Sequence, residues 1–172
     1  MAERLQHLTE TLNAGIALKR RIIEDLRPSS LANLGLAASL EILTREFSQH
    51  SGLVVDAMLE NVELQESHQL TVYRLVQESL TNVAKYAQAS RVEVTLHAYA
   101  HVVEVSVRDD GKGFDTAAMR PSTHGLAGMR HRVEAAGGRL SVTSAPGQGT
   151  RVMAILPLAA PAGAAVPATQ GG

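Results

Sequence analysis

The feature that most constrains the fold is a pair of short stretches in which apolar and polar residues alternate. Every second position is valine or leucine in residues 92–96 and again in residues 103–107. Successive side chains of a β-strand point to opposite faces, so each stretch predicts a strand with one buried face. Only a few residues separate the two stretches, and the pair is therefore expected to form a β-hairpin.

The rest of the chain predicts helices and strands around this hairpin. Leucine and isoleucine recur at helical spacing before Pro28, which ends a first helix, and Gly52 ends a second one. Besides the hairpin, the predicted elements are helices over about 3–27, 31–50, 69–88 and 125–136, and strands over about 53–59, 139–144 and 150–157. Because strands follow one another in pairs, we expect an α+β fold. It would be a two-layer sandwich, with a mixed, mostly antiparallel sheet, helices on one face and one long helix before it.

Composition narrows the class of protein. Sixteen basic and seventeen acidic residues give a net charge of −1, which argues against a nucleic-acid partner held mainly by overall charge. The absence of cysteine excludes a disulfide framework and fits a cytoplasmic protein. No apolar run reaches the ~20 residues that cross a bilayer, so we expect no membrane contact from this chain. Residues 159–172 are mostly alanine, proline and glycine, which predicts a disordered tail.

The predicted third helix carries a row of polar residues opposite its apolar side. Glu78, Asn82 and Lys85 follow one another at helical spacing. Such a row is typical of an ordinary solvated face. It would also suit a Mg²⁺-phosphate site, because Mg²⁺ prefers oxygen ligands and a lysine neutralises phosphate charge. The predicted apolar side consists of Tyr73, Val76, Leu80, Val83, Ala84 and Ala87.

A second polar cluster follows the predicted hairpin. Strand alternation places Asp109 on the apolar face of its strand, where a carboxylate is costly unless a group donates a hydrogen bond to it. Gly111 and Gly113 follow, and glycine lets the backbone approach a ligand closely. Alternatively, residues 110–111 form a tight turn that Asp109 merely caps. Against this, residues 114–124 do not resume a strand.

Four stretches, in this order, resemble the ATP-binding domain shared by histidine kinases, gyrase and the heat-shock chaperone class. Residues 77–87 look like its N box and residues 109–115 like its D-x-G-x-G box. Residues 124–130 look like its second glycine box and residues 147–150 like its third. The resemblance extends over about residues 3–158 and implies an ATP-Mg²⁺ site on the predicted α+β domain.

The resemblance implies roles for residues near the nucleobase. Asp109 would accept a hydrogen bond from the adenine amino group, which would explain a carboxylate on an apolar face. Gly111 and Gly113 would let the chain pass close to the base, and Tyr86 would lie against the adenine ring. Thr150, in the third glycine box, would also bind the nucleotide.

The resemblance implies a second group of residues near the phosphates. Asn82 would ligate a Mg²⁺ ion that bridges the phosphates, and Lys85 would lie near them. Glu78 would be the catalytic carboxylate that orients water or accepts a proton. Residues 114–124 would form a lid over ATP. The nucleotide-binding residues of the second glycine box would be His124, Gly125, Leu126 and Gly128.

Two short sequences refine the resemblance. Leu26-Arg27-Pro28 and Leu34-Gly35-Leu36 resemble short sequences of the histidine kinases that partner LuxR-type response regulators. The resemblance then divides the chain into three parts. Residues 1–29 would form the second helix of a dimerisation and phosphoacceptor hairpin, residues 30–158 the ATP-binding catalytic domain, and residues 159–172 the tail. The sequence around the acceptor histidine of such kinases is missing. We therefore expect a truncated kinase that does not phosphorylate itself when isolated.

The resemblance also implies partners and leaves one alternative function. The expected activity is transfer of the γ-phosphate of ATP-Mg²⁺ to a histidine in two-component signalling. Its partners would be a phosphoacceptor helix, a dimer partner and a LuxR-type response regulator. The alternative is an ATP-binding regulatory module or an anti-sigma-type serine kinase on the same fold. The predicted first helix, which ends in Leu26-Arg27-Pro28, favours the histidine kinase because it resembles half of a dimerisation hairpin.

Overall fold

The computed structural model describes residues 28–116 and 124–158. The predicted first helix and the predicted tail lie outside the described residues, as does most of the predicted lid. The elements, in chain order, are α2 (Ser29–Leu34), α3 (Leu36–Ser51), β1 (Val54–Leu59), α4 (Glu66–Asn82), the π-helical turn η1 (Val83–Ala87), β2 (Arg91–Ala98), β3 (Val102–Asp109), α5 (His124–Ala135), β4 (Arg139–Ser144) and β5 (Thr150–Pro157).

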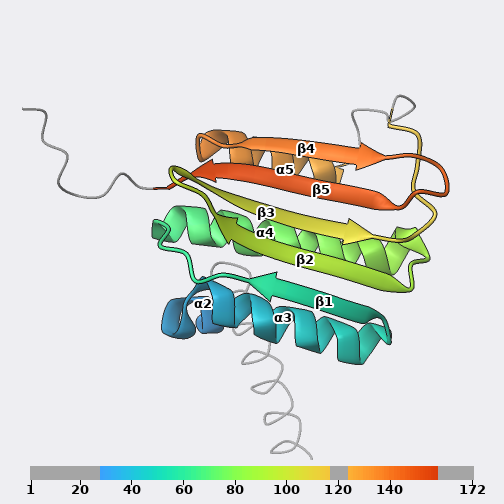
Figure 1. Ribbon diagram of the computed structural model, residues 1–172, viewed down its shortest axis with the longest axis horizontal. Coiled ribbons are helices and arrows are strands. Elements are labelled where there is room, and N and C mark those ends of the chain that lie inside the picture. The colour runs from blue at the N-terminus through green and yellow to red at the C-terminus, as the bar shows by residue number, and fades with distance from the viewer. Residues whose placement is uncertain (1–27, 117–123, 159–172) are drawn as a thin grey trace, which may run out of the picture.

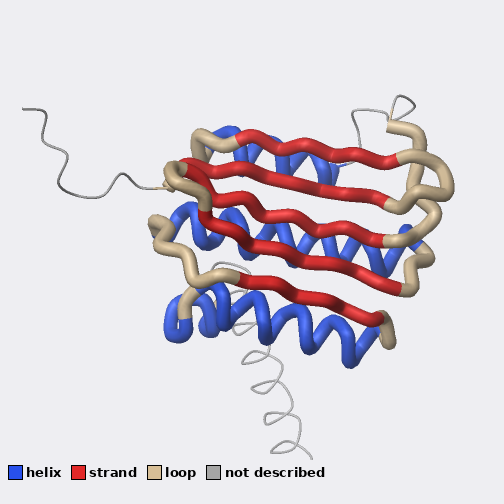
Figure 2. Tube along the Cα trace, in the orientation of Figure 1, coloured by secondary structure: helices blue, strands red, loops and turns tan. Residues whose placement is uncertain are grey.

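The five strands form one mixed sheet in the order β1-β2-β3-β5-β4. β1 pairs with β2 in parallel, and every other pair is antiparallel. Helices α4 and α5 run behind the sheet, and α3 lies along its β1 edge (Figures 1 and 2). The predicted α+β sandwich, with a mostly antiparallel sheet and helices on one face, is confirmed.

The alternation along the strands determines the register of the core. Val94, Val107 and Val152 are neighbours across three strands and are all buried. The same face of the sheet carries Asp109, which pairs in register with Thr150 of β5. The helices complete the core from behind. Their fully or almost fully buried side chains include Val72, Leu75, Val76, Leu80, Met129 and Val133.

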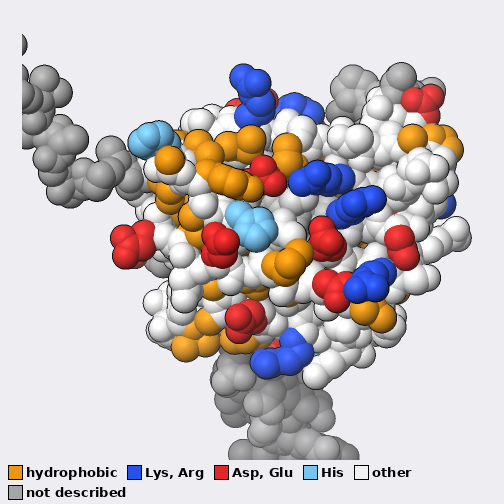
Figure 3. All heavy atoms as spheres, in the orientation of Figure 1, with side chains coloured by type: hydrophobic (Ala, Val, Ile, Leu, Met, Phe, Trp, Pro, Cys, Tyr) orange, Lys and Arg blue, Asp and Glu red, His pale blue; other side chains and the backbone are white. Residues whose placement is uncertain are grey.

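No described helix covers the opposite face of the sheet, where charges of both signs are interspersed (Figure 3). Arg91 of β2 forms an ion pair with Asp56 of β1. Arg151 of β5 lies 3.5 Å from the carboxylate of Glu104 and donates a hydrogen bond of 2.9 Å to Ser106. Opposite charges on neighbouring strands stabilise a sheet modestly. Among the described residues, no helix is both long and apolar enough to cross a membrane.

The predicted second helix is divided by a glycine. Gly35 has φ 82° and ψ 178°, which no helical residue adopts, so α2 ends before it and α3 starts after it. The carbonyl oxygen of Gly35 still accepts a hydrogen bond from the Ser39 amide at 3.2 Å. Gly52 ends α3, as predicted.

The predicted third helix starts earlier than expected and ends in a π-helical turn. α4 begins at Glu66 and passes at Val83 into η1. A π-helical turn contains more residues than an α-helical one, so the side chains that follow are rotated around the axis. The prediction that Ala84 lies on the apolar side was therefore wrong: Ala84 is exposed, together with Lys85 and Tyr86.

Candidate functional site

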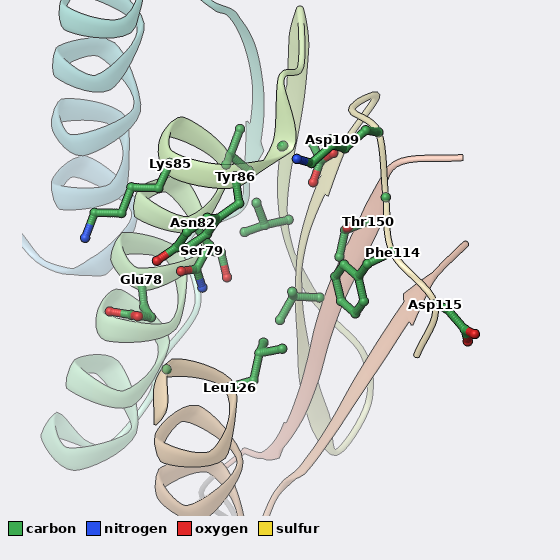
Figure 4. A pocket seen from close by; sticks show the side chains of 17 residues that line it. Glu78, Ser79, Asn82, Lys85, Tyr86, Asp109, Phe114, Asp115, Leu126 and Thr150 are labelled. Atoms are coloured by element: carbon green, nitrogen blue, oxygen red, sulfur yellow. The ribbon is translucent and has the colours of Figure 1, made fainter. Parts of the chain in front are cut away.

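A cavity of about 770 Å³ lies between α4, η1, the first residues of α5 and the ends of β3 and β5. Figure 4 shows the polar side chains of α4 on one side of it and Asp109, Thr150 and Phe114 on the other. We call these the helix side and the strand side. The predicted site residues that line the cavity are Glu78, Asn82, Lys85, Tyr86, Asp109, Gly113, Gly125, Leu126 and Thr150.

Two predicted site residues are not among the residues that line this cavity. Gly111 is buried outside the lining of the cavity, and Gly128 lies further along α5. The backbone of His124 begins α5, but the prediction for its side chain lies outside what the structure describes.

Eight residues of the cavity wall were not among the predicted site residues, although Phe114 and Asp115 begin the predicted lid. They are Ser79, Val83, Ala87, Val107, Lys112, Phe114, Asp115 and Val152. Val107 and Val152 were within reach of the sequence, because strand alternation places them on the same face as Asp109 and Thr150. Ser79 lies on α4 between Glu78 and Asn82. The other five depend on how η1 and the residues after β3 approach each other, which no local pattern indicates.

Asp109 is a carboxylate in an apolar wall. It is only 7% exposed, and its Oδ1 accepts a hydrogen bond of 2.8 Å from the Gly111 amide. Burial raises the pKa of Asp109, while hydrogen bonds from the amides of Gly111 and Thr150 lower it in part. Asp109 thus caps the turn, as the alternative interpretation expected, and also lines the cavity.

Asp110 binds the start of β2 and the residue before it. Its Oδ1 accepts hydrogen bonds from the amides of Ser90 at 2.8 Å and Arg91 at 2.9 Å. These two bonds hold the pKa of Asp110 below its ordinary value. The adjacent Lys112 amide donates to the carbonyl oxygen of Ala87 at 2.8 Å. The residues after β3 are therefore fastened to the end of η1.

Residues 109–114, which we call the glycine segment, also pack tightly against protein backbone. A Cβ atom at Gly111 would overlap the carbonyl oxygen of Ala87. At Gly113, where φ is 60°, a Cβ atom would overlap the carbonyl oxygen of Ala145. The structure thus requires both glycines for contacts within the protein, and their predicted closeness to a base stays a prediction.

The hairpin between β4 and β5 fastens the other side of the glycine segment. The Gly147 amide donates to the carbonyl oxygen of Lys112 at 2.6 Å. The Phe114 amide donates to Ser144 Oγ at 2.9 Å. Hydrogen bonds to η1 on one side and to the β4–β5 hairpin on the other therefore hold the glycine segment in place.

The helix side brings Glu78 and Asn82 of α4 against Gly125 at the start of α5. A Cβ atom at Gly125 would lie 2.6 Å from Glu78 Oε1 and 3.8 Å from Asn82 Nδ2. Any larger residue there would displace the carboxylate. The polar row of α4 therefore lines a cavity rather than an open solvated face. The amides of the first turn of α5 lie at the same end, and a helix N-terminus attracts anions.

The donor set of the helix side fits a hard cation that a ligand helps to bind. Carboxylate and amide oxygens are Mg²⁺ ligands, and Mg²⁺ is usually held by one or two protein groups together with phosphate oxygens and water. No group of three or more His, Cys, Asp or Glu residues suited to a metal occurs in residues 28–116 and 124–158.

Residues 67–160, more than half of the chain, match the family described as histidine kinase-, DNA gyrase B-, and HSP90-like ATPases. The chain belongs to this family. Membership in this ATPase family implies that the domain binds ATP, and the resemblance drawn from the four boxes is confirmed.

Two curated relatives of this ATPase domain are signal transduction histidine-protein kinase/phosphatases. DegS of Brevibacillus brevis is 33% identical over 156 residues, which are 90% of this chain and 40% of DegS. UhpB of Salmonella typhimurium is 36% identical over 158 residues, which are 87% of this chain and 30% of UhpB. The chain spans less than half the length of either relative.

A solved structure has the same fold. The histidine kinase domain of the Erythrobacter litoralis EL346 blue-light activated histidine kinase is similar with a TM-score of 0.64 and 26% sequence identity. The similarity covers 72% of this chain and 61% of that domain. The ATPase domain described above is therefore of the type found in histidine kinases.

Proposed function

We propose that this domain binds ATP together with Mg²⁺ and donates the γ-phosphate to a histidine in two-component signalling. The observation that carries the proposal is the buried Asp109 carboxylate in the same cavity as Glu78 and Asn82. A base acceptor and metal-binding oxygens at opposite sides of one cavity suit a nucleoside triphosphate. The histidine kinases among the relatives support phosphotransfer to histidine.

The strand side would bind adenine. Asp109 would accept a hydrogen bond from the amino group of adenine, whereas guanine has a carbonyl oxygen at that position. The valines around Asp109 would pack against the ring, which adds apolar contact but little discrimination between purines. Tyr86, which is 63% exposed on η1, would cover the base from the solvent side.

The helix side would bind the phosphates. Asn82 would hold Mg²⁺, which on binding neutralises phosphate charge, and Lys85 would add a positive charge nearby. Glu78 would orient the attacking group or accept its proton. The Gly125 position leaves room for this carboxylate, because any side chain there would meet Glu78 Oε1. Phosphoryl transfer depends mainly on such positioning and charge neutralisation.

The partners proposed for this domain are those of a two-component histidine kinase, a class that the relatives support. Phosphotransfer needs a phosphoacceptor helix with a histidine and, in a dimeric kinase, a second copy of the protein. The phosphate would pass on to a LuxR-type response regulator in the cytoplasm. Residues 1–29 would form half of the dimerisation hairpin, and the proposed catalytic domain would extend over residues 30–158.

Nucleotide binding is tested first by thermal unfolding. At a ligand concentration of about 100 times Kd, ATP-Mg²⁺ should stabilise the fold by roughly 2.7 kcal/mol, which gives a measurable rise in Tm. GTP-Mg²⁺ should give a smaller rise, because its carbonyl oxygen would face the Asp109 carboxylate. Equal rises for ATP and GTP would contradict adenine recognition by Asp109.

Phosphotransfer is tested with γ-labelled ATP and a separate fragment that carries the dimerisation hairpin of a similar kinase such as DegS. The expected product is an acid-labile, base-stable phosphohistidine on that fragment. The chain alone should form none, because His7, in the predicted first helix, has no acidic residue next to it in the sequence to orient the imidazole. A phosphohistidine mapped to His7, or phosphoserine on a partner, would contradict the proposal.

A further inference from the structure

One hydroxyl group on the strand side has three polar neighbours. Ser144 Oγ, at the end of β4, lies 2.9 Å from the Phe114 amide and 2.9 Å from the carbonyl oxygen of Gly149. It also lies 3.0 Å from Oγ1 of Thr150. Ser144 therefore connects the glycine segment to the first residue of β5, which lines the cavity.

The chemistry of these neighbours determines where each hydrogen lies. An amide can only donate and a carbonyl oxygen can only accept, whereas a serine hydroxyl has one hydrogen and two lone pairs. The Ser144 hydrogen therefore goes to Gly149, since otherwise two oxygens would face each other at 2.9 Å without a hydrogen. The hydrogen between the two hydroxyls must then come from Thr150.

This assignment leaves Thr150 with only lone pairs to present to the cavity. The neighbouring group is the Asp109 carboxylate, to which the Thr150 amide donates a hydrogen bond and with which Thr150 is paired in register. Figure 4 shows both side chains on the same side of the cavity. The strand side thus presents two acceptors on residues that are paired in register and line the cavity, and an exocyclic amino group has two hydrogens to donate.

We propose that Ser144 is a positioning residue that makes the site selective for purines with an amino group at C6, because it holds the Thr150 hydroxyl as an acceptor. The inference rests on the nucleotide binding proposed above and concerns its base specificity. A purine with a carbonyl oxygen at C6, such as hypoxanthine, would face two acceptors. Once Ser144 is removed, the Thr150 hydroxyl can rotate and donate to that oxygen.

The measurement is the ratio of the affinities for ADP and IDP, obtained by calorimetry with Mg²⁺ present. Ser144→Ala should lower this ratio about three- to tenfold, the effect of a single hydrogen bond. Ser144→Thr keeps a hydroxyl at the same place on a strand, and it should restore the ratio to within about twofold of the wild type. The matched control is Ser141→Ala, since strand alternation turns Ser141 to the other face of the sheet.

A second background separates positioning from a loss of structure, because Ser144 also accepts from the Phe114 amide. In a Thr150→Val protein there is no hydroxyl to orient, so Ser144→Ala should leave the ADP/IDP ratio unchanged. A simple loosening of the glycine segment would instead lower the affinity for both nucleotides in both backgrounds.

Each negative result leads to a different conclusion. If the wild type binds neither ADP nor IDP, the proposed function fails and the inference falls with it. If the wild type prefers ADP and Ser144→Ala keeps the full preference, only the inference is overturned. It is likewise overturned if Ser144→Ala lowers the ratio equally with and without the Thr150 hydroxyl.

Discussion

The strand side of the cavity is held by bonds within the protein, whereas the helix side presents side chains toward the space that a ligand would fill. Asp109 receives hydrogen bonds from backbone amides, and its neighbours pack against carbonyl oxygens of η1 and of the β4–β5 hairpin. Within the described part of the chain, no hydrogen bond or ion pair holds the side chains of Asn82 or Lys85.

This difference separates two requirements of a binding site. A group that recognises a base needs a fixed direction, which a network of short backbone contacts provides before the ligand arrives. A group that binds a metal or phosphate needs charge and reach, and its best partner is the ligand itself. Changes on the strand side should therefore affect folding and binding together, and changes on the helix side should affect binding alone.

The largest expected effect is that of Gly113→Ala on folding. A Cβ atom at this position would overlap the Ala145 carbonyl oxygen and would sit on a residue with φ 60°. We expect a loss of about 3 kcal/mol in the free energy of unfolding, measured in urea without nucleotide.

The matched change for Gly113→Ala is Gly128→Ala in α5. A Cβ atom there would meet only the flexible end of Arg132 at 3.4 Å, and alanine favours a helix over glycine. Its free energy of unfolding should be unchanged or slightly higher. Equal destabilisation of both variants would contradict the tight packing of Gly113 against the Ala145 carbonyl oxygen.

Asp109→Asn should have the next largest effect, on affinity. The variant keeps the volume of the side chain but loses a charged acceptor, which costs on the order of 1.5–3 kcal/mol of binding free energy, or about tenfold or more in Kd. Calorimetry with ATP-Mg²⁺ measures the loss, and unfolding without nucleotide shows whether the fold is intact. Wild-type affinity in this variant would place the base elsewhere.

Asn82→Ala should have a smaller effect that depends on the metal. We expect the Kd for ATP to rise about tenfold with Mg²⁺ and to change little in excess chelator, because the amide oxygen acts through the ion. The control is Thr81→Ala on the same helix, since its hydroxyl donates to the Gln77 carbonyl oxygen. An identical loss with and without Mg²⁺ would remove Asn82 from the metal site.

The smallest expected effect is a change of stability with pH in the absence of nucleotide. Burial raises the pKa of Asp109 above its ordinary value of 3.8, so the folded protein binds this proton more tightly than the unfolded chain. The cost of the ionised carboxylate is fully present above the raised pKa. It is relieved as the pH falls through that pKa toward 3.8.

The difference between the wild type and Asp109→Asn isolates this contribution. The lowered pKa of Asp110 acts in the opposite direction, since its stabilising effect is lost as the pH falls through that pKa, but both proteins share it. As the pH falls, the Tm of the wild type should therefore gain on the Tm of the variant. A difference between the two Tm values that stays constant with pH would show that burial does not raise the pKa of Asp109.

Much of the fold and of the candidate site could be predicted from the sequence, because it depends on local periodicity. The alternation in 92–96 and 103–107 predicted the hairpin and the face of Asp109, and helical spacing brought Glu78 and Asn82 into one row. The predicted bounds of the last two strands, 139–144 and 150–157, agree with the structure. Periodicity indicates which side of an element is buried. That was sufficient to predict the two layers of the fold and about half of the residues that line the cavity.

The rest could not be predicted, because it depends on contacts between residues distant in the sequence. Ser144 is 30 residues from Phe114 in the chain, and nothing near either residue indicates that they meet. The exposure of Ala84 follows from the π-helical turn, whose last residue, Ala87, accepts a hydrogen bond from the distant Lys112 amide. The glycines were predicted as a group, but Gly111 and Gly113 are each required by a carbonyl oxygen elsewhere in the protein, and Gly125 by the Glu78 carboxylate.

The packing of Gly111 and Gly113 against the protein's own carbonyl oxygens also bears on how such domains diverge. A descendant that lost every ligand of the nucleotide would still need both glycines to close its chain. Purifying selection on these two positions would then reflect the need to fold, while selection on Asp109 and Asn82 would reflect the need to bind the nucleotide. A gene that keeps the glycines but has replaced both polar residues would encode a folded relative that has become a pseudoenzyme.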